Sequence, residues 1–376
     1  MDQQGEETLE TTLDPDRQAT ASAAILPGAI DCDVHPEPPQ MAELLPYLDT
    51  YLRESVVQRG IGALHSTAYP LNAPITVRED WRGPTGAAQS LDRMRRDLFD
   101  GLGVGTAILN PLYGLQLLME EQMAAGFATG LNTFTAREWL DPEPRLRASI
   151  VVPMQNPAMS VAEIERWAGD PRFVQVLLLV MGEMPLGKRY YWPIYEAAAA
   201  HDLPVAIHAG SMYRYGTTGL GWPSFHAQDY AGNAMAFQAA LASLVCEGVF
   251  SMFPKLRVVL SESGFSWLPA FLWRMDKFWH GLRMEVPWVD RRPAEIVAEH
   301  VRFTLQPLDA PPTAADTERL IAHTGSEDLL LFSTDYPHWQ FDGTRAVPSG
   351  LSAPLVRRMM IDTPRATYPR LREKPA

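Results

Sequence analysis

The 376-residue sequence predicts an α/β protein built as an eight-fold (β/α)8 barrel. Eight short apolar segments, typical of buried parallel strands, alternate with helical patterns along most of the chain. The turn after the first strand, D-V-H-P-E-P at residues 33–38, lacks the glycines of a doubly wound nucleotide-binding sheet. Polar side chains also stand where several strands end. A barrel whose carboxyl-terminal face carries a site explains all three observations.

Composition indicates one folded domain with a tail. Hydrophobic residues make up 46% of the chain and charged residues 20%. Residues 1–23 are rich in small and polar groups, so we expect a disordered or loosely docked arm before a single domain at residues 24–376. The net charge of −13, with no basic stripe, argues against a nucleic-acid partner.

Several further features limit the class of protein. Cys32 and Cys246 form no disulfide framework, and both are expected to be buried reduced thiols. No apolar run reaches about 18 residues, so no membrane span is expected. The N-terminus lacks the pattern of a signal peptide, and we expect a cytoplasmic protein.

The expected elements follow one another regularly. The strands are expected at residues 29–33, 103–110, 147–153, 174–180, 204–210, 256–264, 301–307 and 329 to about 335. Helices are expected at residues 91–102, 115–140, 160–168, 192–201, 233–253, 267–280, 313–324 and 356–361. Residues 41–59 read as short helices broken at Pro46. Two long loops, an inserted region at residues 60–85 after the first strand and residues 211–230, would cover a pocket.

Four side chains at three strand ends form a candidate metal site. Asp33 and His35 share one face of the first strand, because residues two apart point the same way. His208 ends the fifth strand and Asp335 ends the eighth. Strand ends of a parallel barrel open on one face, so these groups would meet there. Two carboxylates and two imidazoles suit a divalent ion.

Each of these residues also has an ordinary structural interpretation. The Asp-x-His pair would suit a hydrogen-bonded strand end, and His208 could bond to backbone. Asp335 could cap the following turn, and Glu262, at the end of the sixth strand, could pair with an arginine. The joint occurrence of polar groups at several strand ends favours the metal site.

The motifs resemble the amidohydrolase superfamily. They are D-x-H on the first strand, I-H-A-G on the fifth, L-S-E-S-G on the sixth and F-S-T-D-Y-P-H on the eighth. The resemblance is closer to the amidohydrolase-2 family, which includes aminocarboxymuconate-semialdehyde and resorcylate-type decarboxylases, and covers about residues 29 to 370. It implies a distorted (β/α)8 TIM barrel with one divalent metal. Asp33, His35, His208 and Asp335 match the family's ligands, and Asp335 would also handle the proton of a metal-bound water.

The sequence departs from the family at several positions. Asp33 stands where the family often has His or Glu. Glu262 replaces the histidine of the better-known decarboxylases, and Phe265 replaces a glutamate. The fourth strand ends in Val180 and Met181, without the lysine that bridges two metals in other superfamily members. A single ion is therefore implied, and the changes on the sixth strand weigh against a decarboxylase.

Three functions remain open, and a mononuclear metal-dependent hydrolase of a small carbonyl substrate comes first. There the ion activates a water, and Asp335 accepts and returns its proton. Glu262 is a second acid/base candidate, or a group that positions His208. A metal-dependent, non-oxidative decarboxylase of an aromatic or unsaturated acid is the alternative. The third reading is a non-catalytic barrel without metal.

The remaining expectations concern ligands and partners. The ion would be zinc or manganese, and Glu37 would replace Asp33 as its ligand if the chain turns back at Pro36. The residues expected to bind substrate lie in the 211–230 loop or just past the eighth strand: Tyr213, Arg214, Trp222, His226 and His338. The aromatic-rich segment at residues 267–280 would be either a homodimer surface or an outer helix packed on its own core.

Overall fold

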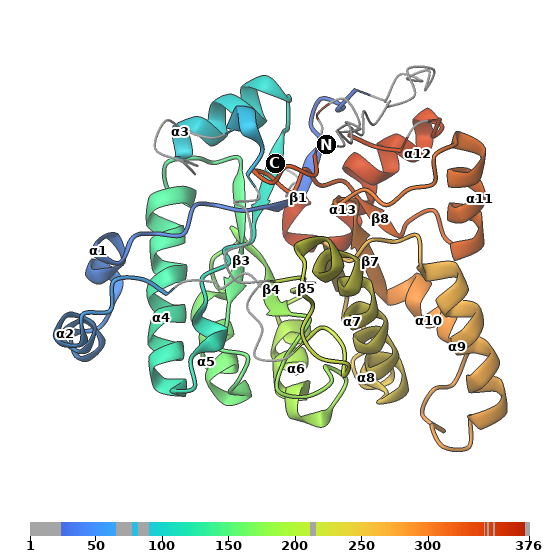
Figure 1. Cartoon of the computed structure of the whole chain (residues 1–376), viewed down its shortest axis with the longest axis horizontal. Helices are drawn as coiled ribbons and strands as arrows, with labels where there is room; N and C mark the ends of the chain where they lie inside the picture. The colour runs from blue at the N-terminus through green and yellow to red at the C-terminus, as the bar shows by residue number, and fades with distance from the viewer. Residues whose placement is uncertain are drawn as a thin grey trace, which may run out of the picture.

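Eight parallel strands form the centre of the molecule, as the sequence predicts. The computed structural model of the protein describes residues 24–64, 77–81, 90–210, 216–341, 343, 346–348 and 350–372. The strands pair in sequence order from β1 to β8, each with the next (Figure 1). They are β1 (Ile30–Val34), β2 (Thr106–Leu109), β3 (Leu146–Val151), β4 (Phe173–Leu179), β5 (Val205–His208), β6 (Val258–Ser261), β7 (Val301–Thr304) and β8 (Leu330–Leu331).

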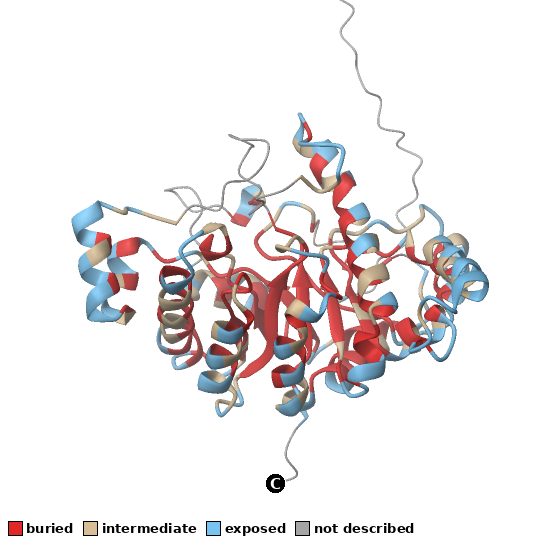
Figure 2. Cartoon of the chain, turned by 90° about the horizontal axis from the view of Figure 1, so that it is seen from below, coloured by how far each residue is buried: buried red, intermediate tan, exposed pale blue. Residues whose placement is uncertain are grey.

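Helices surround the strands. They are α1 (Met41–Leu44), α2 (Thr50–Arg59), α3 (Leu91–Met94), α4 (Glu121–Phe134), α5 (Pro157–Trp167), α6 (Trp192–Ala200), α7 (His226–Cys246), α8 (Val249–Met252), α9 (Leu268–Leu282), α10 (Pro293–His300), α11 (Ala314–Thr324), α12 (Ala353–Arg357) and α13 (Thr363–Thr367). Three π-helical turns continue α3, α4 and α12: Arg95–Gly101, Thr135–Leu140 and Arg358–Asp362. The central strands are buried, and the exposed sides of the helices face outward (Figure 2).

The last strand is shorter than expected, and irregular backbone completes the ring. β8 covers only two of the seven residues expected, because the chain beyond it leaves the strand conformation and turns left-handed at Asp335, with φ of 55°. Backbone hydrogen bonds still cross from this segment to β1. They join Cys32 N–H to the Phe332 carbonyl (2.9 Å), Asp335 N–H to the Asp33 carbonyl (3.1 Å) and His35 N–H to the Tyr336 carbonyl (2.7 Å).

A buried carboxylate strengthens the same seam. Asp31 accepts hydrogen bonds from the backbone N–H of Thr334 (3.0 Å) and from its hydroxyl. Burial raises the pKa of Asp31 to about 7, although the hydrogen bonds from Thr334 oppose that shift. The side chain therefore joins the first and last strands from within the barrel, one pleat behind Asp33.

Some helices differ from the expected ones. The helix expected at residues 233–253 begins earlier, at His226, and is divided into α7 and α8 by Gly248, whose φ is 83°. α10 was not expected: it runs into β7 without a turn between them, so the sequence carries no stop signal. Residues 41–59 form α1, a 3₁₀ turn containing Pro46, and α2, as expected.

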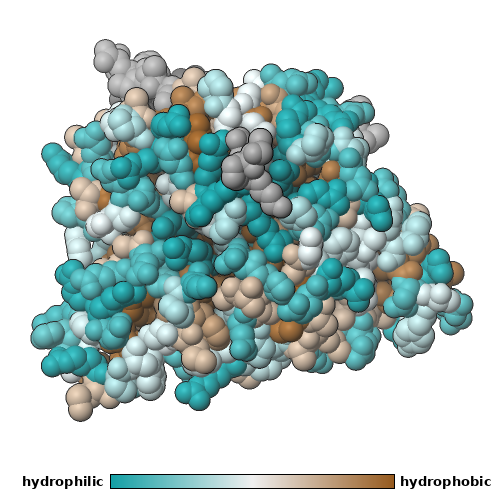
Figure 3. Space-filling model, turned by 180° about the vertical axis from the view of Figure 1, so that it is seen from behind, coloured by the Kyte–Doolittle hydropathy of each residue, from teal (hydrophilic) through white to brown (hydrophobic). Residues whose placement is uncertain are grey.

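The structure tests the expectations about the two cysteines and about membrane spans. Cys32 is buried, but Cys246 is exposed, so the expectation of a buried thiol is wrong there; both are free. Along the described part of the chain, no helix combines the length and apolar character needed to cross a membrane. The face opposite to that of Figure 1 is largely hydrophilic, interrupted by separate hydrophobic patches (Figure 3).

The aromatic-rich segment forms α9, which packs on the core as one of the two expected alternatives requires. Leu268 and Leu272 are buried against the core. Trp273, Phe278 and Leu282 of the same helix remain about half exposed. The segment is therefore an outer helix with apolar groups left over, and a homodimer contact there stays a prediction.

A buried carboxylate at the start of β3 ties neighbouring elements together. Glu143 accepts three hydrogen bonds from Arg145, including both guanidinium bonds at 2.8 and 2.9 Å, and one from Arg95 at 2.9 Å. Hydrogen bonds from Arg145 lower its pKa to about 2, against the opposing effect of burial.

We expect the pair of Glu143 and Arg145 to make a pH-dependent contribution to stability. A carboxylate whose pKa falls on folding stabilises the protein fully above its unfolded pKa of about 4.5 and loses that effect as the pH falls toward 2. We expect Glu143→Gln to lower the free energy of unfolding by about 1–3 kcal/mol at pH 7. The difference from wild type should shrink below pH 4.5 in urea titrations. Exposed Glu54→Gln is the control, and a difference independent of pH would contradict the assignment.

Candidate metal centre

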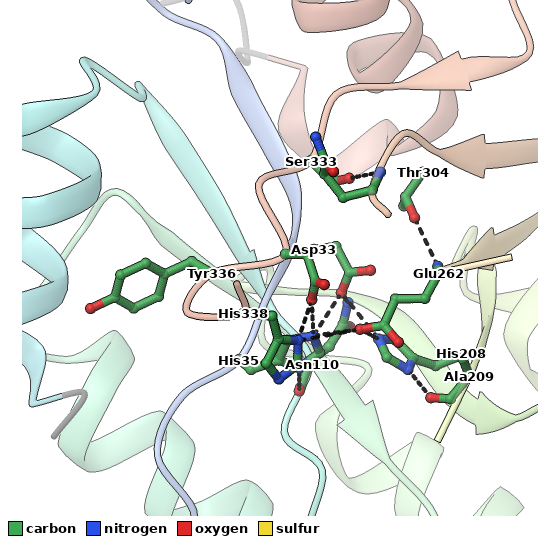
Figure 4. A network of polar contacts seen from close by, with 12 residues as sticks. Asp33, His35, Asn110, His208, Ala209, Glu262, Thr304, Ser333, Tyr336 and His338 are labelled. Atoms are coloured by element: carbon green, nitrogen blue, oxygen red, sulfur yellow. Dashed lines mark hydrogen bonds and ion pairs between the residues drawn. The ribbon is translucent and has the colours of Figure 1, made fainter. Parts of the chain in front are cut away.

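Six ionisable side chains meet at the carboxyl-terminal ends of the strands. β1 supplies Asp33 and is followed by His35, and β5 ends in His208. Glu262 follows β6 directly, and Asp335 and His338 lie in the segment after β8. The labelled imidazoles and carboxylates point toward one another from opposite sides of the barrel (Figure 4). These strand ends converge in the structure, as the sequence predicts.

The donor atoms are close enough to share an ion. They fall into two groups, each with all its donor atoms within 4.8 Å of one another: Asp33, His35, His208 and Glu262; and His35, Glu262, Asp335 and His338. The Nε2 atom of His35 lies 3.5 Å from Asp33 Oδ1, 3.4 Å from Glu262 Oε1 and 3.1 Å from Asp335 Oδ1. His208 Nε2 lies 3.3 Å from Asp33 Oδ1.

Backbone carbonyls orient the two imidazoles. His35 Nδ1 lies 3.0 Å from the carbonyl of Asn110, and His208 Nδ1 contacts the carbonyl of Ala209. A carbonyl only accepts, so each ring places its proton on Nδ1. Each Nε2 therefore faces the carboxylates and could offer its lone pair to a bound ion, which is how a histidine ligand is usually held.

An amide network supports Asp33 from below. Asn110 Nδ2 donates to Asp33 Oδ1 at 2.7 Å. The Asn110 amide oxygen in turn accepts from Gln175 at 3.0 Å and from the Ser149 hydroxyl. Sequence reasoning placed Asn110 at a strand end but gave it no role. The only signal was its position at the end of the second strand.

Unpaired polar atoms test whether the cluster fits a cation. Four buried atoms of the cluster make no hydrogen bond with any described residue: Asp33 Oδ2, His35 Nε2, Glu262 Oε1 and Asp335 Oδ2. Leaving such atoms buried and unpaired costs free energy. Oxygen and imidazole donors are the ligands that divalent ions take from proteins. The donor set therefore fits a divalent ion.

The backbone is strained at two members of the cluster. Glu262 and Asp335 have φ values of 57° and 55°, in the left-handed region that L-residues seldom occupy. Such strain costs on the order of 1–3 kcal/mol per residue and persists where the surroundings enforce it. Thr304 Oγ1 accepts the N–H of Glu262 at 3.1 Å and so helps to hold that conformation.

The charges of the cluster perturb one another. Burial lowers the pKa of His35, but the nearby carboxylates of Asp335 and Glu262 raise it well above its usual range. For Glu262, burial raises the pKa, but the charge of His208 and the nearby imidazoles of His338 and His35 bring it well below normal. Burial, together with the charge of Glu262, raises the pKa of Asp335. Protons thus compensate the carboxylates here, which is the task a cation performs.

The other expected residues lie at varying distances from the cluster. His338 belongs to it: its Nδ1 is 2.6 Å from Asp335 Oδ1 and its ring stacks on His35, with centroids 4.8 Å apart. His226 begins α7, half-buried against Tyr230 at 4.7 Å, while Trp222 is exposed. The expected substrate residues Tyr213 and Arg214 lie outside the described residues.

Glu37 lies apart from the donor groups. It lines a small pocket with prolines and aromatic residues, among them Pro111 and Trp139. It is in neither donor group among the described residues. The geometry therefore favours Asp33 over Glu37 at this position.

Both the fold and the sequence of this chain are similar to those of known proteins. Residues 30–370 match the model of the amidohydrolase-2 family, described as Amidohydrolase. The chain belongs to this family. The match spans the whole barrel, from β1 to the end of the described helices, and confirms the resemblance found in the sequence motifs.

Relatives of this amidohydrolase-2 chain include decarboxylases. A gamma-resorcylate decarboxylase from Polaromonas sp. strain JS666 is 26% identical over 70% of this chain and 82% of its own length. A crystal structure of dihydroxybenzoic acid decarboxylase from the same organism, with bound manganese and the inhibitor 2-nitroresorcinol, has a TM-score of 0.62 at 19% identity and covers 93% of this chain and all of that one. 5-Carboxyvanillate decarboxylase from Sphingomonas paucimobilis has a TM-score of 0.65 at 17% identity, covering 91% and 98%.

Metal binding should be visible as stabilisation. Adding Mn²⁺ at about 100 times its Kd to metal-stripped protein is expected to raise the free energy of unfolding by about 2.7 kcal/mol, measured as a rise in Tm. Asp33→Asn should lose most of that rise, because it removes a charged donor. Glu37→Gln, the matched carboxylate outside the cluster, should keep it. Equal rises in both variants would contradict the ligand role of Asp33.

Proposed function

We propose that this amidohydrolase-2 enzyme is a metal-dependent, non-oxidative decarboxylase of hydroxylated aromatic acids. The supporting observation is the match to gamma-resorcylate decarboxylase over 70% of the chain, together with a family match at residues 30–370 that includes the strand ends carrying the donor cluster. Sequence analysis placed hydrolysis first because Glu262 replaces a histidine. The comparisons favour the decarboxylase alternative instead.

Some residues of the cluster would bind the metal ion, and others would transfer protons. Asp33, His35 and His208, with Asp335 at the edge, would hold the ion. Manganese is our preferred ion, because the structure of a similar decarboxylase contains it. When bound, a divalent ion supplies a Lewis acid that neutralises the substrate's carboxylate and adjacent hydroxyl oxygens. The network from Asn110 keeps Asp33 fixed while the substrate enters.

Asp335 is the proposed proton donor to carbon. As the bond between the ring and the carboxyl carbon breaks, its electron pair stays on the ring carbon, which takes a proton from Asp335 while carbon dioxide leaves. His338, whose Nδ1 lies 2.6 Å from Asp335 Oδ1, is placed to return a proton to that carboxylate. His338 is partly exposed, so the proton reaches it from solvent. His226, Trp222 and Arg214, all from the 211–230 loop of the sequence, remain predicted substrate contacts.

The reaction class can be tested on a panel of acids. Manganese-loaded protein should release carbon dioxide from 2,6-dihydroxybenzoate or 5-carboxyvanillate, measured by coupled assay or headspace analysis. Benzoate, which lacks the neighbouring hydroxyl, is the control and should not react. Hydrolysis of an ester or amide panel without carbon dioxide release would overturn the proposal and restore the hydrolase.

The role of Asp335 can be tested by substitution. Asp335→Asn cannot donate a carboxylic proton, so turnover should fall by about 10²–10⁴-fold. Tm should stay within a few degrees of wild type. Exposed Asp290→Asn is the control and should keep full turnover. An Asp335→Asn enzyme with near-normal turnover would remove Asp335 from proton transfer.

A further inference from the structure

The backbone around Glu262 fixes the direction of its side chain. It follows β6 directly, in the left-handed conformation, and its N–H is held by Thr304. This conformation turns the side chain across the barrel mouth, toward the imidazoles of other strands (Figure 4). The carboxylate is therefore fixed by its backbone before any ligand binds.

Three imidazole nitrogens surround one oxygen of this carboxylate. Oε1 of Glu262 lies 3.4 Å from His35 Nε2, 3.7 Å from His208 Nε2 and 3.6 Å from His338 Nδ1. Although buried, Oε1 forms no hydrogen bond with any of the residues described. Its side chain is 12% exposed, so water reaches it only at the edge.

These separations are those of atoms that share an ion. Donors at about 2.0–2.2 Å from an ion lie roughly 3.3–3.6 Å apart in a tetrahedral site and roughly 2.8–3.1 Å apart in an octahedral one. The contacts among Asp33 Oδ1, His35 Nε2, His208 Nε2 and Glu262 Oε1 run from 3.3 to 3.7 Å, close to the tetrahedral range. A hydrogen-bonded pair would be shorter.

Glu262 also has a special place among the donors. It and His35 are the two residues common to both donor groups. An ion beside Asp33 and His208 and an ion beside Asp335 and His338 would both contact its Oε1. We infer that Glu262 is a direct ligand of the metal, in addition to the ligands expected from the sequence. This inference rests on the proposed metal site but not on the reaction, since a hydrolase would use the same centre.

The added carboxylate changes the character of the centre. Asp33, Glu262 and Asp335 would give three carboxylates with the imidazoles of His35 and His208. Oxygen-rich sites suit manganese, whereas zinc prefers nitrogen and sulfur donors. The inference therefore assigns the choice of a harder ion to Glu262, one of the residues that depart from the decarboxylase pattern.

The direct test is a crystal structure of the wild-type protein loaded with Mn²⁺, with anomalous data at the manganese edge. We expect Glu262 Oε1 within about 2.4 Å of the ion. An ion whose distance to Oε1 exceeds about 3 Å, with a water between them, would overturn the inference. No substrate is involved, so a bound Glu262 without carbon dioxide release would refute the proposed reaction alone.

A solution measurement accompanies the structure. Glu262→Gln keeps the shape of the side chain and removes its charge, so Mn²⁺ affinity in a chelator competition should fall at least tenfold. Glu37→Gln is the matched control and should bind as wild type does. Unchanged affinity in Glu262→Gln would overturn the inference. Should that variant fail to fold, the wild-type structure decides.

Discussion

The structure depends on the burial of several ionisable groups in one place without enough hydrogen bonds to satisfy them. Asp33, His35, Glu262 and Asp335 each leave a buried polar atom with no hydrogen bond to the described part of the chain, at the end of a barrel where strand ends must converge. Burying charges in this way is unfavourable unless a counter-ion compensates them. A divalent ion removes this cost, and the orientation of the imidazoles prepares for it.

The same constraint explains features of the fold that otherwise weaken it. The chain leaves β8 after two residues and turns left-handed at Asp335, which gives up regular strand pairing with β1. The buried bond between Asp31 and Thr334 and the backbone bonds across the seam compensate for that loss. Strain at Asp335 and Glu262 aims both carboxylates inward, where regular strand conformation would not place them.

The sequence predicted the barrel and most of the cluster because both follow from local periodicity. Alternation in I-D-C-D-V-H puts Asp33 and His35 on one face, and parallel strands carry His208 and Asp335 to the same end. It did not predict how Glu262 is used, since that depends on a left-handed backbone held by Thr304, a contact between strands. The sequence also did not show that His338 belongs to the cluster, because its position there depends on the turn that the chain makes after β8.

The measurement that tests this account most directly is the metal content of protein purified without chelator, determined by elemental analysis. A cluster that needs a cation to compensate its buried charges should hold close to one divalent ion per chain, with manganese favoured when it is supplied during expression. A content near zero, in protein that also fails to take up Mn²⁺ afterwards, would contradict the account. The cluster would then be a proton-compensated network, and both metal-dependent reactions would be excluded.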